Sequence, residues 1–194
     1  MIAFIRGDFV LKTPAMVQVE ANGVGYELHI SLNTYSQIQA REKGLLYTHL
    51  HIREDAHILY GFADTQEKEM FLQLLSVSGV GAATARMMLS SMKPSEITRA
   101  IVQGNHKQLE SIKGIGKKSA ERIVLELRDK VGKSVLETNN VSLIHNTLEQ
   151  DALNALVALG IARNAGEQAI RKVLSTEPDL TQIEDIIKKS LKTL

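Results

Sequence analysis

The chain of 194 residues has no cysteine and no tryptophan, only three prolines, and no long hydrophobic run. Without cysteine, neither a disulfide nor a thiolate metal site can form. No apolar stretch approaches the roughly 18 residues of a membrane-spanning helix, and the start MIAFIRGDFV lacks the apolar core of a signal peptide. We therefore expect a soluble, cytoplasmic protein without a membrane partner.

The net charge of +1 is distributed unevenly. Residues 1–62 carry 5 basic and 6 acidic side chains, residues 63–132 carry 11 and 8, and residues 133–194 carry 7 and 8. The net charges of these segments are −1, +3 and −1. A polyanion should therefore bind the middle third first.

Residues 1–62 have the pattern of a small β-barrel. Alternating runs flank the pair Asn22-Gly23, which is a signal for a two-residue hairpin turn. The run LLYTHLHIREDAHILYGF predicts a second hairpin that turns at REDA, and a short helix at about 32–40 separates the two. Five strands and one helix in this length suit a closed five-stranded barrel of the OB type.

Seven of the eight aromatic residues lie in this segment: Phe4, Phe9, Tyr26, Tyr35, Tyr47, Tyr60 and Phe62. Most alternate with polar residues, which favours a place in the barrel core. A stacking platform for single-stranded nucleic acid is the alternative, although the acidic balance of the segment does not favour it.

Residues 63–132 read as helices that contain a tandem repeat. LLSVSGVGAATARMML aligns with LESIKGIGKKSAERIV after a shift of 35 residues, so that each unit is a helix, a G-[VI]-G turn and a second helix. The spacing matches neither a P-loop nor a dinucleotide fingerprint. The residue between the glycines is expected to pack down between the helices, while the next amides face outward at a helix N-terminus, where a phosphate is favoured.

This pattern is the helix-hairpin-helix signature of proteins that bind DNA without reading its sequence. Lys117 and Lys118 add positive charge to the second unit, whereas the first has Ala82 and Ala83 at the matching positions. We expect the first site to be the weaker one. The predicted phosphate-binding residues are Gly79, Val80, Gly81, Ala82, Ala83, Gly114, Ile115, Gly116, Lys117, Lys118 and Ser119.

After the repeat, residues 133–147 are weakly periodic and polar in their middle, as expected of a flexible linker. Residues 148–194 contain three short helical segments and predict a small three-helix, UBA-like domain. The predicted fold is therefore α+β and multidomain: barrel 1–62, tandem helix-hairpin-helix 63–132, linker 133–147 and helical domain 148–194.

This order of domains, together with REDAHILYGF, GIGKKSAER and ALVALG, resembles the RuvA family of Holliday-junction-binding subunits of bacterial branch-migration complexes. The resemblance implies that Glu54 and Asp55 form an acidic pin at the junction centre and that Arg122 joins the second phosphate site. The family's lysine after the first glycine pair is missing here, and Arg86 is the candidate substitute.

The resemblance also implies partners. These are four-way junction DNA, the AAA+ motor RuvB, the resolvase RuvC and further copies of the chain, as a homotetramer or an octamer. The C-terminal domain is expected to bind the motor, with Leu156, Leu159 and Ile161 as candidate contacts. Such a subunit is not an enzyme and needs neither cofactor nor metal; ATP hydrolysis belongs to the motor.

A junction nuclease that uses Glu54 and Asp55 is the alternative from another class. A metal site at His49, His51 and His57 is also conceivable, but no carboxylate has convincing ligand spacing.

Overall fold

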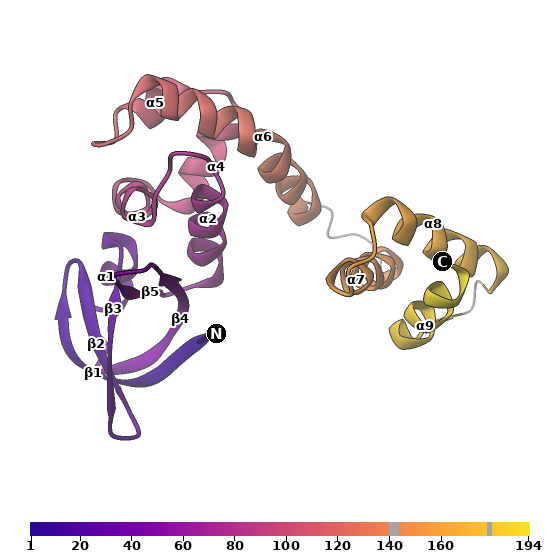
Figure 1. The fold of residues 1–194 in the computed structure, drawn as a ribbon, viewed down its shortest axis with the longest axis horizontal. Helices are drawn as coiled ribbons and strands as arrows, with labels where there is room; N and C mark the ends of the chain where they lie inside the picture. The colour runs from indigo at the N-terminus through magenta and orange to yellow at the C-terminus, as the bar shows by residue number, and fades with distance from the viewer. Residues whose placement is uncertain (140–143, 178–179) are drawn as a thin grey trace. The chain divides into compact units, whose positions relative to one another are not determined.

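The computed structural model describes residues 1–139, 144–177 and 180–194. They form two compact units, Met1–Leu136 and Glu137–Leu194, whose elements are labelled in Figure 1. No helix in these described ranges is both long and apolar enough to cross a membrane.

The first unit begins with the predicted five-stranded barrel, which closes in the order β1-β2-β3-β5-β4. Asn22 and Gly23 have φ of 52° and 83°, as a tight hairpin turn of the primed type requires. The barrel core is made mostly of buried aliphatic side chains, among them Val17, Val19 and Leu46. The elements are β1 Phe4–Thr13, β2 Met16–Ala21, β3 Val24–His29, α1 Leu32–Ile38, β4 Lys43–Ile52 and β5 His57–Phe62.

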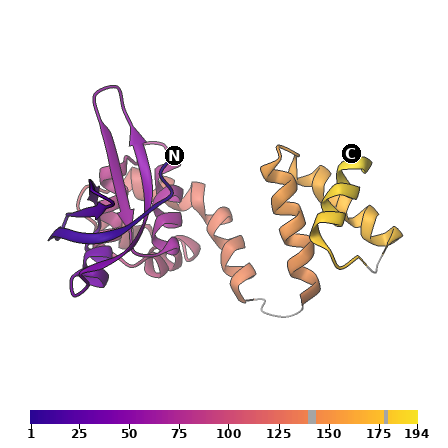
Figure 2. The same ribbon diagram turned by 90° about the horizontal axis from the view of Figure 1, so that it is seen from below.

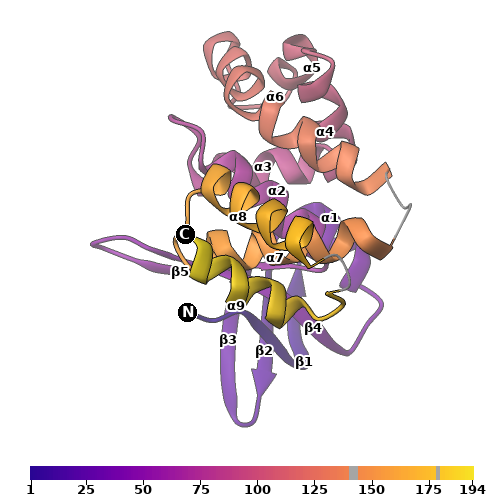
Figure 3. The same cartoon turned by 90° about the vertical axis from the view of Figure 1, so that its right-hand side faces the viewer.

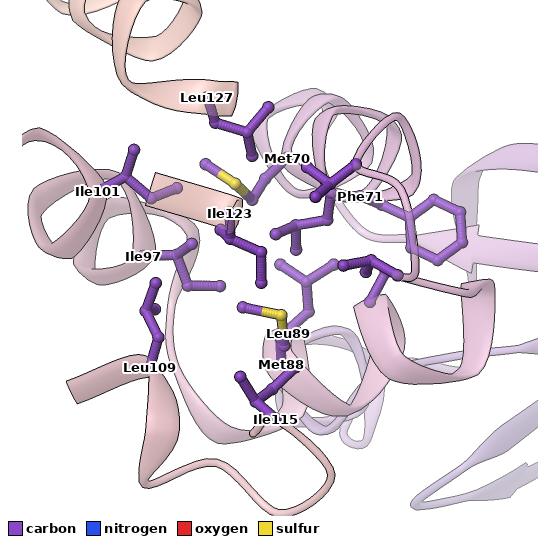
Figure 4. Packing of buried hydrophobic residues seen from close by; sticks show 14 of the residues in the cluster. Met70, Phe71, Met88, Leu89, Ile97, Ile101, Leu109, Ile115, Ile123 and Leu127 are labelled. Carbon is purple, nitrogen blue, oxygen red and sulfur yellow. The ribbon is translucent and has the colours of Figure 1, made fainter. Parts of the chain in front are cut away.

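Five helices follow in the same unit and bury one apolar core (Figure 4). Phe71, Met88, Ile97 and Ile123 are completely buried in it. Met87, which the sequence places on the same helix as Met88, is 46% exposed. The helices are α2 Thr65–Leu75, α3 Ala82–Ser91, α4 Pro94–Val102, α5 His106–Glu110 and α6 Lys117–Asn139.

The barrel and these helices share buried side chains. The Phe71 ring lies 5.0 Å from the rings of both Tyr60 and Phe62, measured between centroids. Phe9 is a barrel-core residue as predicted, but Tyr60 and Phe62 belong to the helical core instead. The predicted boundary at 62/63 therefore lies inside one compact unit.

The second unit is a three-helix cluster (Figure 2), as predicted for the C-terminal domain. It consists of α7 Ile144–Ala158, α8 Arg163–Thr176 and α9 Ile183–Thr193. Ala152, Leu156 and Ile186 lie in its core.

The predicted linker 133–147 differs from the structure at both ends. Residues 133–139 continue α6 and residues 144–147 begin α7, while residues 140–143 lie outside the described ranges. The segment mixes good helix formers such as Lys133 with weaker ones such as Ser134 and Thr138, and its extension of α6 costs little because the helix has already begun. Periodicity alone therefore misses these turns.

Candidate nucleic-acid interface

The two helix-hairpin-helix units have the same local hydrogen bonds. In the first, the Val80 amide donates to the Val77 carbonyl at 3.0 Å, and the Ala85 amide donates to the Gly81 carbonyl at 2.9 Å. The corresponding bonds 35 residues later are 3.0 and 2.9 Å long. The repeat read in the sequence is thus a repeat of backbone geometry.

The glycines of each turn have two different roles. Gly79 and Gly114 have φ of 87° and 92°, a left-handed conformation that a side chain disfavours. Gly81 and Gly116 do not have positive φ, and a Cβ added to either would meet no neighbour within 4 Å. At the first position of each pair, the conformation of the turn therefore requires glycine. At the second position, nothing within the chain requires it.

The apolar residue between the glycines anchors each turn, as predicted. Val80 and Ile115 are each only 5% exposed and belong to the helical core, in which Figure 4 labels Ile115 together with Met88 and Leu109. The helices α3 and α6 begin within two residues of these anchors. Their first amides have no partner within the helix, so each turn presents N–H donors at a positive helix end.

The charges beside the two turns differ. Lys117 and Lys118 are exposed on the first turn of α6, and Lys113 is exposed one residue before Gly114. At the first turn, Ala82 is completely buried and Ala83 is exposed but uncharged. The predicted site does not include Lys113. The sequence could have indicated this residue, because it is basic and lies inside the repeated motif.

The arginines are placed differently from the prediction. The Arg86 guanidinium donates to the Ala15 carbonyl at 3.1 Å and lies 3.3 Å from His29 Nδ1, so it is held against the barrel. The Arg122 guanidinium, which belongs to the second helix-hairpin-helix repeat, instead donates to the Ser78 carbonyl at 3.2 Å. The positive side chain at the first turn is therefore Arg122 and not Arg86, because α6 passes close to that turn.

The acidic residues lie at the tip of the β4–β5 hairpin, which extends from the barrel (Figure 3). The Arg53 amide donates to the Ala56 carbonyl at 2.8 Å and closes the turn. Glu54 and Asp55 lie between them and are exposed. Two carboxylates are thus held at the end of a projecting hairpin.

The histidines of this hairpin do not assemble a metal site. Within the described ranges, no three His, Asp or Glu side chains are grouped closely enough to hold a metal ion. Burial, with the neighbouring His51 and Lys68, lowers the pKa of His49. The centroid of the His49 ring lies 5.7 Å from that of the Phe71 ring, a contact that costs less free energy for a neutral imidazole than for a charged one.

The three candidate motor contacts have unequal exposure. Leu156 is completely buried in the C-terminal core and Ile161 is partly buried against it. Leu159 is 63% exposed and Val157 is 43% exposed. The free apolar surface around the turn at Gly160 is therefore made by Val157 and Leu159, and Leu156 has to be removed from the predicted contacts.

Comparison with known proteins matches all three regions of the chain. The description "RuvA N terminal domain" matches residues 1–61, "SAM-like Helix-hairpin-helix tandem" matches residues 71–129, and "RuvA, C-terminal domain" matches residues 147–194. The chain belongs to the RuvA family.

Full-length RuvA relatives confirm this assignment. The chain is 47% identical over 195 residues to a Flavobacterium psychrophilum protein, with 100% of both chains covered. It is 45% identical over 194 residues to one from Christiangramia forsetii, again with 100% of both covered. A Cytophaga hutchinsonii protein is 44% identical over 197 residues, with 99% of each chain covered. All three are named Holliday junction branch migration complex subunit RuvA.

Alanine substitution of the two kinds of glycine in this RuvA-family chain should change the free energy of unfolding by different amounts. Gly114→Ala should lower the free energy of unfolding by about 1–2 kcal/mol, because alanine disfavours the left-handed conformation. Gly116→Ala should change it by less than about 0.5 kcal/mol, since neither φ nor space opposes a methyl group. Chemical denaturation measures both values; equal losses would contradict the assignment of roles.

Proposed function

We propose that this protein is the junction-binding subunit of a branch-migration complex: it holds four-way DNA by its phosphates, keeps it open, and recruits the motor RuvB. The supporting observation is the duplicated turn, which presents helix-start amides twice in one rigid core. Two such turns suit the two strands of one duplex, and contacts to phosphates carry no base sequence. The glycines at 81 and 116, which the fold does not need, fit a close approach of the DNA backbone.

The acidic tip supplies selectivity in this proposal. Glu54 and Asp55 would repel any phosphate placed near them, so they disfavour a continuous duplex across the junction centre and tolerate an open junction. A nuclease is less well supported. Metal-dependent cleavage needs clustered ligands, and within the described ranges this pair belongs to no such cluster.

The assembly follows from the substrate. Four arms related by one axis suit four copies of the chain, so we propose a homotetramer that can pair into an octamer. It works in the cytoplasm with the resolvase RuvC as a further partner.

Val157 and Leu159 are the proposed apolar contacts of the C-terminal unit with the motor. The division into DNA-binding residues 1–132 and a motor-binding domain 148–194, joined by 133–147, is part of the same proposal.

The second turn should dominate phosphate binding. Lys117→Ala with Lys118→Ala should weaken junction binding equally for different base sequences and make its salt dependence shallower. If four copies hold about eight phosphates, the logarithm of the binding constant should fall with that of salt with a slope near −7 in the unmodified protein. Titrations at several salt concentrations measure this; a slope near zero, or a strong dependence on sequence, contradicts it.

Neutralising the pin should reduce selectivity. Glu54→Gln with Asp55→Asn should raise affinity for plain duplex and narrow the difference between junction and duplex, because repulsion is removed while the phosphate contacts remain. Gel shifts with four-way junction, duplex and single strand measure this, with and without Mg²⁺. An unchanged preference contradicts the repulsive role, and Mg²⁺-dependent cutting that the double substitution abolishes supports the nuclease.

Removing the C-terminal unit should separate the two functions. A chain ending at Leu136, the end of the first compact unit, should bind junctions normally and fail to stimulate the ATPase of the motor. Leu159→Ser in the full chain should have the same effect on the motor, whereas Arg163→Ser, at an exposed position nearby, should not. Loss of junction binding by the shortened chain would contradict this division.

A further inference from the structure

A carboxylate is completely buried where the barrel meets the helices. Glu67, in the first turn of α2, has 0% exposure. Its two oxygens accept hydrogen bonds from the hydroxyl of Ser31 and, at 2.6 Å, from that of Thr34. Both hydroxyls belong to the start of α1, more than thirty residues earlier. One side chain thus joins two elements that are distant in the sequence.

The directions of these hydrogen bonds require an acceptor at both oxygens. The Ser31 hydroxyl already accepts from the Thr34 amide at 3.0 Å, and the Thr34 hydroxyl accepts from the Ala63 amide at 3.0 Å. The hydroxyl hydrogens are therefore free to point at Glu67. A carboxylate accepts both, whereas an amide would direct an N–H group at one of the hydroxyls.

The same helix α1 is also attached to α3, which carries the first phosphate turn. The Asn33 side-chain amide donates to the Leu89 carbonyl at 2.6 Å and to the Met92 carbonyl at 3.1 Å. The Leu32 amide donates to the Ser90 hydroxyl at 3.1 Å. Helix α1 therefore bonds to both α2 and α3, and Glu67 is its buried attachment to α2.

This attachment is costly. Burial raises the pKa of Glu67, although the hydroxyls of Ser31 and Thr34 oppose the rise. An apolar side chain of similar size would avoid the cost of burying the carboxyl group, but it would leave the hydroxyl hydrogens of Ser31 and Thr34 without an acceptor. A buried carboxyl group that accepts a hydrogen bond at both oxygens can favour one arrangement of the elements that it joins.

We infer that Glu67 is a positioning residue: through Ser31 and Thr34 it fixes the orientation of the barrel, and with it the pin of Glu54 and Asp55, relative to the phosphate turns. It thereby sets the preference for junctions over duplex, while the phosphate turns set the affinity. The inference rests on the proposed function, since the preference it explains is that of a junction-binding subunit.

The absence of cysteine allows a direct test. A thiol-reactive spin label would modify a pair of introduced cysteines and no other residue of the chain. His57→Cys on the hairpin and Gln103→Cys at the end of α4 place spin labels on the two parts. Their distance is measured by electron paramagnetic resonance in labelled protein diluted with unlabelled protein. With Glu67→Gln the distance distribution should broaden or shift, whereas Glu69→Gln, exposed on the same helix, should leave it unchanged.

Binding gives the second readout. Glu67→Gln should lower the ratio of junction to duplex affinity about tenfold, and leave duplex affinity within about twofold. Thr34→Val, which removes one of the two donors, should act in the same direction, and Thr34→Ser should retain the ratio. These variants also cover the case in which Glu67→Gln does not fold.

The outcomes separate the alternatives. An unchanged distance and an unchanged ratio overturn the inference, as does an equal loss of junction and duplex affinity together with a lower melting temperature. If the unmodified protein itself has no preference for junctions, the proposed function fails, whatever the spin-label distances are.

Discussion

The burial of Val80 and Ile115 is the interaction on which the proposed DNA-binding surface depends. Each side chain is held in the common helical core, and it fixes the turn in which it stands. The left-handed glycines just before them let the chain reverse there, and the helices α3 and α6 start directly after. In the proposed function, the donors to a phosphate are therefore backbone amides, whose position is set by apolar packing and not by a flexible side chain.

The two turns share the same backbone geometry, but the charged side chains beside them differ. The second turn has its own lysines, whereas the first has alanines. The Arg122 guanidinium of the second helix-hairpin-helix repeat donates to a carbonyl at this first turn. The first turn thus receives its positive side chain from α6, the helix that follows the second turn. The acidic tip stands on a separate hairpin, so that in the proposed function the attraction of phosphates and their repulsion come from different elements.

The parts of the fold with local causes could be predicted from the sequence. The 35-residue repeat, the Asn22-Gly23 turn and the order of the three regions each depend on residues that are close together in the chain. The contacts between distant residues could not be predicted in this way. Arg122 reaches a carbonyl 44 positions earlier, and Glu67 reaches hydroxyls 33 and 36 positions earlier.

The exposure of apolar side chains likewise depends on how the helices pack. Leu156 and Leu159 are three positions apart, yet one is completely buried and the other is 63% exposed. Met87 and Met88 differ in the same way. A helical pattern identifies an apolar stripe, but the partners that cover it decide where the stripe ends.

In the proposed function, two backbone turns of each chain hold DNA through its phosphates. Replacing single phosphates of a four-way junction by uncharged methylphosphonates separates this mode of binding from recognition of the bases. Binding should weaken at two short groups of positions on each arm, one on each strand, while base substitutions at the same positions have no effect. A uniform small loss of affinity along the arms, or sensitivity to the bases instead of the phosphates, would show that the two turns do not hold the DNA in this way.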